Sequence, residues 1–304
     1  MSYVIEYGEK PEDAIKRIAK EQLTDAARQL RGEGHEKREE AIHEARKDLK
    51  KLRAVIRLVR PRIGENVYQT ENAAYREAGQ LLAPMRDSYA RIEAIDTLIK
   101  ELDNVELKKA ARVIRKQLSK EYQSVRRDFL KNDEPVQRAL AILDEAEQRV
   151  DDYWAISKTD FRAFKKGLKK VYKRGQKAMA VAFDGTSNVE HFHDWRKRVK
   201  YLMYHTRILM PLWIQILEPY EAQLDQLSEY LGNAHDFALL YDYLLSYEDF
   251  QTGDERHVLA QLDYYRAQFE DAAKPLGMRI YAESENDFIE RLSGYWDAWQ
   301  TAQT

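Results

Sequence analysis

The chain has 304 residues, of which 44% are hydrophobic and 34% charged, with 12 glycines, 7 prolines and a formal net charge of −2. It contains no cysteine, which excludes disulfides, thiolate metal sites and cysteine nucleophiles. The sequence has no run of about 18 apolar residues and no secretory signal, so we expect a cytoplasmic protein without membrane contact, built from long charged helices.

Helical periodicity dominates the chain after a short strand or coil over residues 1–11. Pro84 should kink or break the third of the predicted helices, because its ring removes a backbone hydrogen bond. Residues 184–188, with the sequence DGTSN, form an expected loop. The predicted helices are 11–30, 36–60, 66–102, 105–131, 135–152, 158–183, 189–210, 220–248, 254–273 and 283–302.

One face of the second predicted helix is almost entirely cationic. Over residues 43–62 the chain carries eight Lys or Arg against two acidic residues, and the opposite helical face is apolar. Like charges one turn apart repel each other, so such a face usually has an anionic partner. The residues on this face are His43, Arg46, Lys47, Lys50, Arg53 and Arg57.

The same pattern returns 150 residues later. The matching residues are His193, Arg196, Lys197, Lys200 and Arg207. Lys16 and Lys20 likewise match Lys166 and Lys170, and the segment 82–87 has a counterpart at 231–236, one residue short of that offset. The chain is therefore predicted to be a duplicated unit of about 150 residues. With short connections, each copy should be an antiparallel bundle of about four helices.

Two further helices carry cationic faces, while the C-terminal part of the chain is acidic. Residues 108–127 hold eight Lys or Arg and residues 158–177 hold nine, whereas residues 218–304 hold 18 acidic against five basic residues. Segregation of this kind builds a local positive field that attracts a polyanion. A lone basic helix is usually a solvated surface, but four such faces favour a phosphate-binding site, which Arg and Lys suit.

Paired histidines and aspartates occupy equivalent places in the two copies. His43 and His193 are surface residues, phosphate contacts or metal ligands; the neighbouring Arg and Lys disfavour a metal and favour phosphate. Asp87 and Asp236 are expected to hold the nearby arginines in position rather than act as catalytic bases. We expect no metal and no cofactor.

Familiar enzyme signatures are absent from the sequence. It contains no G-x-x-x-x-G-K-[ST], G-x-G-x-x-G, G-x-S-x-G or H-E-x-x-H motif, and no carboxylate cluster that would hold Mg²⁺ near the basic faces. A binding protein rather than an enzyme is therefore predicted. Three alternatives stay open: a nucleic-acid-binding module, which lacks a known reading motif here, a polyphosphate- or triphosphate-processing enzyme, and a metal-binding protein.

The repeated H-x-x-R-[K/R] helices, at 42–61 and 192–211, resemble those of the CHAD family, the conserved-histidine α-helical domain. The segments 167–179 and 231–240 are also similar to that family. The resemblance implies an all-α fold of two pseudo-twofold-related antiparallel bundles around a basic central cleft. It further implies non-catalytic binding of inorganic polyphosphate. On this basis residues 1–11 are an extension, and 12–304 form the CHAD domain from repeats 12–152 and 158–304.

Sequence pattern and resemblance together predict a set of polyphosphate contacts. Binding should strengthen as the pH falls towards the histidine pKa, about 6.5 in peptides. Nucleic acid is a less favoured partner, and association with polyphosphate granules, phosphate sensing and scaffolding stay open, as does the oligomeric state. The predicted contacts are His43, Arg46, Lys47, Lys50, Arg53, Arg57, His193, Arg196, Lys197, Lys200, Arg207, Lys16, Lys20, Arg112, Arg115, Lys166, Lys169, Lys170 and Lys173.

Overall fold

The computed structural model describes residues 3–33, 37–186, 188–247 and 255–302, and these ranges contain helices and no strand. The predicted all-α fold class is confirmed. A single 3-10 turn, η1 (Met210–Leu212), joins two of the helices. The α-helices are α1 (Pro11–Arg31), α2 (Arg38–Ile63), α3 (Glu65–Leu81), α4 (Ala83–Glu101), α5 (Val105–Lys131), α6 (Glu134–Tyr153), α7 (Arg162–Ala182), α8 (Val189–Ile208), α9 (Ile214–Leu245), α10 (Glu255–Ile280) and α11 (Glu285–Thr301).

At several helix ends a glycine, proline or asparagine explains why the helix begins or ends there. Gly32 ends α1 in the left-handed conformation, with φ of 88°, which glycine adopts without strain. Pro84 lies in the first turn of α4, so the predicted helix 66–102 is broken there into α3 and α4. At the start of α8 the Asn188 side chain accepts the His191 N–H at 3.1 Å, and the Asn188 N–H donates to His191 Nδ1.

Three helices extend beyond the bounds predicted for them, 36–60, 220–248 and 254–273, and each contains a proline. α2 continues through Pro61 to Ile63, α9 begins at Ile214 and so includes Pro219, and α10 continues through Pro275. A proline costs one backbone hydrogen bond. Packing outweighs that cost in α10, where Leu276 and Ile280 are buried in the core beyond the proline.

Other expected boundaries move by a few residues or lie outside the described ranges. α7 begins at Arg162 rather than at 158, and α8 ends at Ile208 rather than at 210, where η1 begins. Residues 3–10 are coil, and the Ile5 N–H donates to the Ile208 carbonyl at 3.0 Å. Four predicted features lie outside the described residues: the helix boundaries at 36, 248 and 254, and Ser187 of the expected loop.

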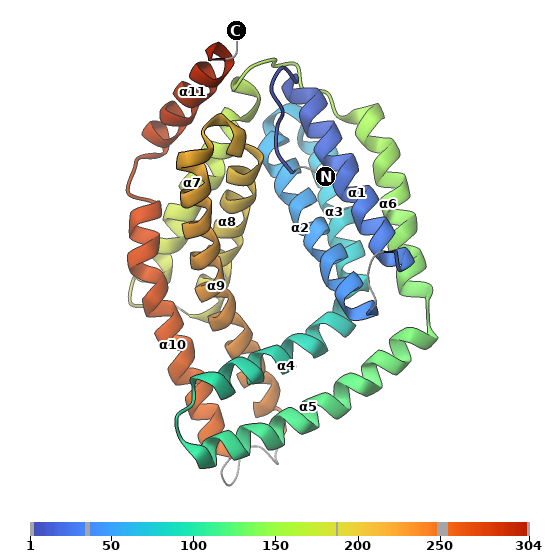
Figure 1. Ribbon diagram of the computed structural model, residues 1–304, viewed down its shortest axis with the longest axis vertical. Coiled ribbons are helices and arrows are strands. Elements are labelled where there is room, and N and C mark those ends of the chain that lie inside the picture. Colours follow the sequence, from blue (N-terminus) through green and yellow to red (C-terminus); the bar gives the residue numbers. More distant parts are fainter. Residues whose placement is uncertain (1–2, 34–36, 187, 248–254, 303–304) are drawn as a thin grey trace.

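The helices form two columns joined by a long hairpin. α1, α2, α3 and α6 pack together in one column, while α7, α8, α9 and α10 pack in the other, with α11 against α7 (Figure 1). The α4–α5 hairpin leaves the first column and packs on α9 and α10 of the second. Each column holds four packed helices, as predicted for a bundle, and the α4–α5 hairpin links the two columns. The internal duplication and the pseudo-twofold relation between the halves stay predictions.

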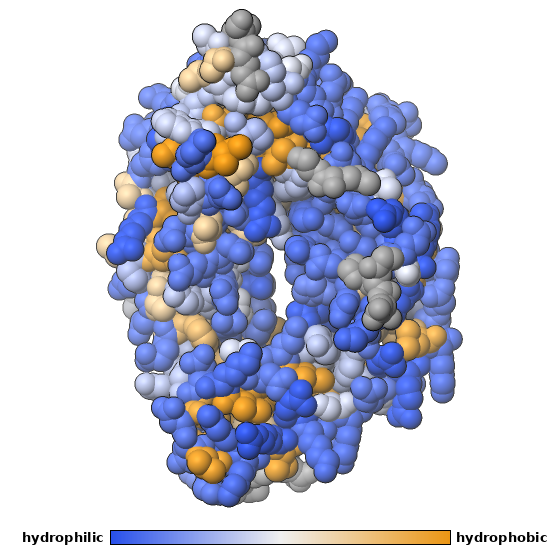
Figure 2. Space-filling model, viewed as in Figure 1, coloured by the Kyte–Doolittle hydropathy of each residue, from blue (hydrophilic) through white to orange (hydrophobic). Residues whose placement is uncertain are grey.

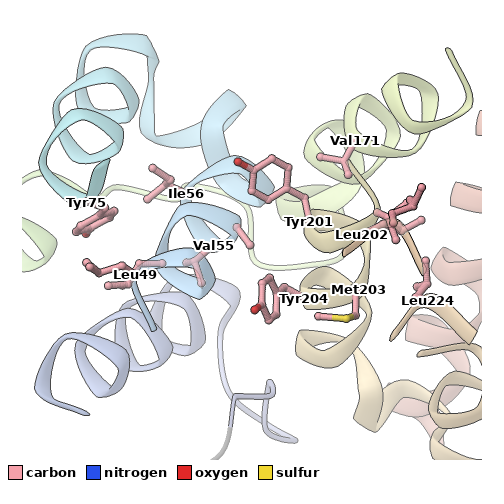
Figure 3. Close-up of a cluster of buried hydrophobic side chains, with 14 of the residues drawn as sticks. Leu49, Val55, Ile56, Tyr75, Val171, Tyr201, Leu202, Met203, Tyr204 and Leu224 are labelled. Carbon is pink, nitrogen blue, oxygen red and sulfur yellow. The ribbon is translucent and has the colours of Figure 1, made fainter. Parts of the chain in front are cut away.

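The two columns meet where α2 packs against α7 and α8. Val55 of α2 faces Met203 and Tyr204 of α8 in the core between them (Figure 3). The buried His205 of α8 lies with its Nε2 2.9 Å from the Ala54 carbonyl oxygen. Away from this contact the columns separate, and the space-filling view shows an opening between them above the hairpin (Figure 2).

Candidate functional site

Cationic side chains from three helices surround a cavity of about 280 Å³ between the two columns, which we call the chamber. The helical repeat of 3.6 residues places His43, Arg46, Lys47 and Lys50 on one side of α2, so all four reach the same space. Six Lys or Arg line the chamber against the single carboxylate of Asp225. The lining residues are His43, Arg46, Lys47, Lys50, Arg86, Lys200, Met203, Tyr204, Arg207 and Asp225.

Lys50 and Lys200 are the two cations of the chamber that make no ion pair within the described residues. The Lys50 side chain is exposed to the chamber, but the surrounding protein displaces most of the bulk water around its ammonium group. This desolvation, together with the positive charges of Arg196, Arg46 and Lys200, lowers the pKa of Lys50 to about 7. Burial and the charge of Arg196 likewise lower the pKa of Lys200 to about 8. Both groups therefore titrate near neutral pH.

The arginines of the chamber are held by carboxylates or carbonyls. Arg46 donates to the Gly79 carbonyl at 2.8 Å and pairs with Asp87 at 3.4 Å. Arg207 pairs with Glu221, and Arg86 pairs with Glu93. Such contacts fix the guanidinium groups while leaving other N–H donors for a ligand.

Arg196 and Asp236 lie beside the chamber and affect each other's charge. Burial lowers the pKa of Arg196, while the charge of Asp236 opposes that change. Burial raises the pKa of Asp236, and the charges of Arg196 and Arg86 oppose it. The Nε atom of Arg196 is buried and has no hydrogen-bond partner among the described residues, so this guanidinium keeps an unused donor.

The two paired histidines have different surroundings. His43 lines the chamber, whereas the His193 ring stacks on the His235 ring at a centroid distance of 4.1 Å. Burial, and then neighbouring cations, lower the pKa of both His43 and His193. The expected pH response near 6.5 therefore moves to lower pH for the histidines. In the described residues no three His, Asp or Glu side chains form a group that could hold a metal ion.

Arg53 and Arg57 lie further along α2, outside the chamber. Arg53 lines an adjoining cavity of about 230 Å³ together with Arg76, and this cavity shares Arg46 and Lys50 with the chamber. The Arg57 guanidinium lies 4.3 Å from the centre of the Tyr201 ring and lines a small hollow with Lys170. The cationic face of α2 thus borders three spaces, of which the chamber and the cavity beside Arg53 adjoin each other.

The remaining predicted contacts do not line the chamber, and their role as ligand contacts stays a prediction. Lys16 pairs with Glu12 and Lys20 with Asp151 on an outer groove. On α5, Arg115 pairs with Asp96 of α4, while Arg112 is exposed. On α7, Lys173 pairs with Glu285 of α11, Lys169 donates to Asn286, and Lys166 is exposed. Lys197 pairs with Asp194 on α8.

Arg86 is the cation of the chamber that sequence reasoning missed. It lies in the segment 82–87, whose counterpart at 231–236 was noted, but the pattern drew attention to Asp87 instead. Its position depends on how α4 crosses towards the second column, which the sequence pattern does not specify. Tyr204 and Asp225 also line the chamber, and neither was among the predicted contacts.

A family model described as CHAD domain matches residues 10–245, most of the chain. The protein belongs to the CHAD family. Membership in this family points to a function connected with polyphosphate. No curated protein sequence matches the chain.

A solved structure shares the fold. PptA from Streptomyces chartreusis is similar to this CHAD protein with a TM-score of 0.65 and 14% sequence identity. The similarity covers 90% of this chain and 100% of that one. At such low identity the likeness concerns the fold alone.

None of the helices in the described ranges is long and apolar enough to cross a bilayer.

Proposed function

We propose that this CHAD protein binds inorganic polyphosphate in the chamber without altering it chemically. The observation that carries the proposal is the excess of cations around one cavity, six Lys or Arg against Asp225 alone among the described residues. Two of these cations, Lys50 and Lys200, have no ion-pair partner in the described residues. A phosphate chain that enters would offset this repulsion and gain charge-assisted hydrogen bonds.

The adjoining cavity supports a chain ligand rather than a single phosphate. Arg46 and Lys50 line both spaces, and Arg53 and Arg76 continue the cationic lining on the far side. No carboxylate lines this second cavity. A polymer of phosphates would therefore meet cations without interruption as it passes Arg46 and Lys50. Because the sequence predicts a cytoplasmic protein, we expect it to act where polyphosphate granules form.

The proposal is tested by titrating long-chain polyphosphate into the wild-type protein and K50E/K200E. The variant should bind at least about 100-fold more weakly, because two charges in the chamber are reversed, a change on the order of 3 kcal/mol. K116E/K120E is the matched control, since both lysines are exposed on α5 and the net charge changes equally. It should bind within about threefold of wild type. Wild-type affinity should also fall steeply with added salt.

Equal binding by K50E/K200E and wild type would overturn the proposal. Phosphate release from polyphosphate in the presence of Mg²⁺ or Mn²⁺ would show that the protein processes its ligand rather than only binding it. Displacement of polyphosphate by RNA at equal phosphate concentration would favour the nucleic-acid alternative.

A further inference from the structure

A second and larger cavity, of about 570 Å³, opens next to the chamber, and we call it the vestibule. Its size falls within the range of small-molecule sites, about 300–1,000 Å³. His43 and Arg86 line both the vestibule and the chamber, so the two spaces share a wall. The vestibule is lined by Lys37, Glu39, Glu40, His43, Glu44, Arg86, Tyr89, Glu93 and Tyr122.

The vestibule differs from the chamber in the sign of its charge. Four carboxylates line it against the cations Lys37 and Arg86. Burial and the nearby Arg86 charge lower the pKa of His43, which favours its neutral form. A phosphate chain would be repelled here, whereas a neutral group rich in N–H or O–H donors would be accepted. The part of a ligand that fills the vestibule must therefore differ from the part that fills the chamber.

Aromatic surface is available in the vestibule. Tyr89 is 37% exposed, and its ring lies 5.4 Å from that of Tyr122. The Arg86 guanidinium lies 5.8 Å from the centre of the Tyr89 ring, at the wall shared with the chamber. An exposed tyrosine beside a cationic phosphate site is the arrangement on which a nucleobase can stack, a contact of about 1–3 kcal/mol.

The carboxylates of the vestibule retain acceptor capacity. Glu40 pairs with Lys37 at 3.5 Å through one oxygen, while Glu44 pairs with Lys47 at 3.1 Å through Oε2 and has His43 Nε2 3.8 Å from its Oε1. An ionised carboxylate has about four lone-pair sites, so one ion pair leaves acceptors free. Ring N–H groups, exocyclic amino groups and ribose hydroxyls are the donors that a nucleoside brings to such acceptors.

We propose that the vestibule and the chamber together bind a nucleoside triphosphate. The nucleoside occupies the vestibule with its base against Tyr89, and the triphosphate passes Arg86 into the chamber. The inference rests on the proposed function in one respect, because it needs the chamber to bind phosphate. It goes beyond the proposed function by adding nucleosides, which the cationic residues of the chamber alone would not distinguish from other phosphate compounds.

The test compares ATP and GTP with inorganic tripolyphosphate in titrations of wild type, Y89A, Y89F and K50E/K200E, with EDTA present to remove metal ions. Wild type should bind at least one nucleotide about tenfold more tightly than tripolyphosphate, which corresponds to about 1.4 kcal/mol. Y89A should lose about that tenfold for the nucleotide and bind tripolyphosphate within about twofold of wild type. Y89F keeps the aromatic ring and should retain its affinity for the nucleotide. K50E/K200E should bind both the nucleotide and tripolyphosphate more weakly than wild type.

The outcomes separate the two proposals. If neither nucleotide binds more tightly than tripolyphosphate, or if Y89A weakens both ligands equally, the vestibule assignment is overturned and phosphate binding in the chamber stands. If tripolyphosphate and nucleotides bind K50E/K200E as tightly as wild type, the chamber is not the phosphate site and both proposals fail.

Discussion

Lys50 and Lys200 bring two ammonium groups into the chamber without an ion pair to either in the described residues. Their pKa values, about 7 and about 8, lie below the ordinary lysine value of 10.5 because water is displaced and Arg196 is close. The negative charge of a bound anion stabilises the ammonium form and outweighs both causes, so binding raises these pKa values and takes up protons. The lysines rather than the histidines should therefore dominate the response to pH near neutrality.

Polyphosphate affinity should fall as the pH rises through the pKa values of the free protein. Below about pH 7 both ammonium groups are charged before binding, and above about pH 8 each must be protonated at a cost. We expect a loss of at least about tenfold between pH 6.5 and 9, measured by calorimetry in buffers that also report proton uptake. K50M/K200M should flatten this profile. Affinity that rises with pH, or no proton uptake, would contradict this assignment.

Substitution of Arg86 tests a predicted phosphate contact that only the tertiary structure reveals. It lines the chamber from α4, and its ion pair with Glu93 leaves other N–H donors free. R86Q should bind polyphosphate about tenfold more weakly, which corresponds to about 1.4 kcal/mol, in a fluorescence titration. R127Q is a suitable control, because Arg127 is exposed on α5 and does not line the chamber. Unchanged affinity in R86Q would remove Arg86 from the site.

At the scale of elements, the helices and their cationic faces could be predicted because both depend on local sequence. The 3.6-residue period alone places His43, Arg46, Lys47 and Lys50 together, and the structure has them on one wall. Packing between distant segments could not be predicted in this way. Arg115 shares a predicted basic face, yet it pairs with Asp96, because α4 and α5 pack as a hairpin.

The contact between α2 and α7 depends on a glycine. A Cβ atom on Gly167 would lie 1.8 Å from the Leu58 carbonyl oxygen, so the two helix backbones approach too closely for any other residue. G167A should lower the free energy of unfolding by about 2–3 kcal/mol in urea denaturation, because the helices must move apart.

The matched control for that change is G294A in α11. A Cβ atom there meets nothing within 4 Å, so alanine should leave stability unchanged or raise it by up to about 1 kcal/mol. If G167A and G294A had the same effect, the close approach of α2 and α7 would not limit stability.

At the scale of the whole molecule, the positions of the charged residues matter more than the net charge. The net charge is only −2, yet the chamber between the columns is lined by six cations and one carboxylate. The columns are held together by the contacts of α2 with α7 and α8 and by the α4–α5 hairpin. At the hairpin the Tyr265 hydroxyl of α10 donates to the Glu101 carbonyl at 2.6 Å. The enclosed space between them concentrates positive potential where a polyanion can enter.

The crystal structure of the protein with bound tripolyphosphate tests phosphate binding in the chamber most directly. We predict ordered phosphate within about 3 Å of the ammonium groups of Lys50 and Lys200, with Arg46 and Arg86 donating to the same anion. Ordered phosphate on the outer faces of α5 or α7, with no anion beside Lys50 and Lys200, would contradict it.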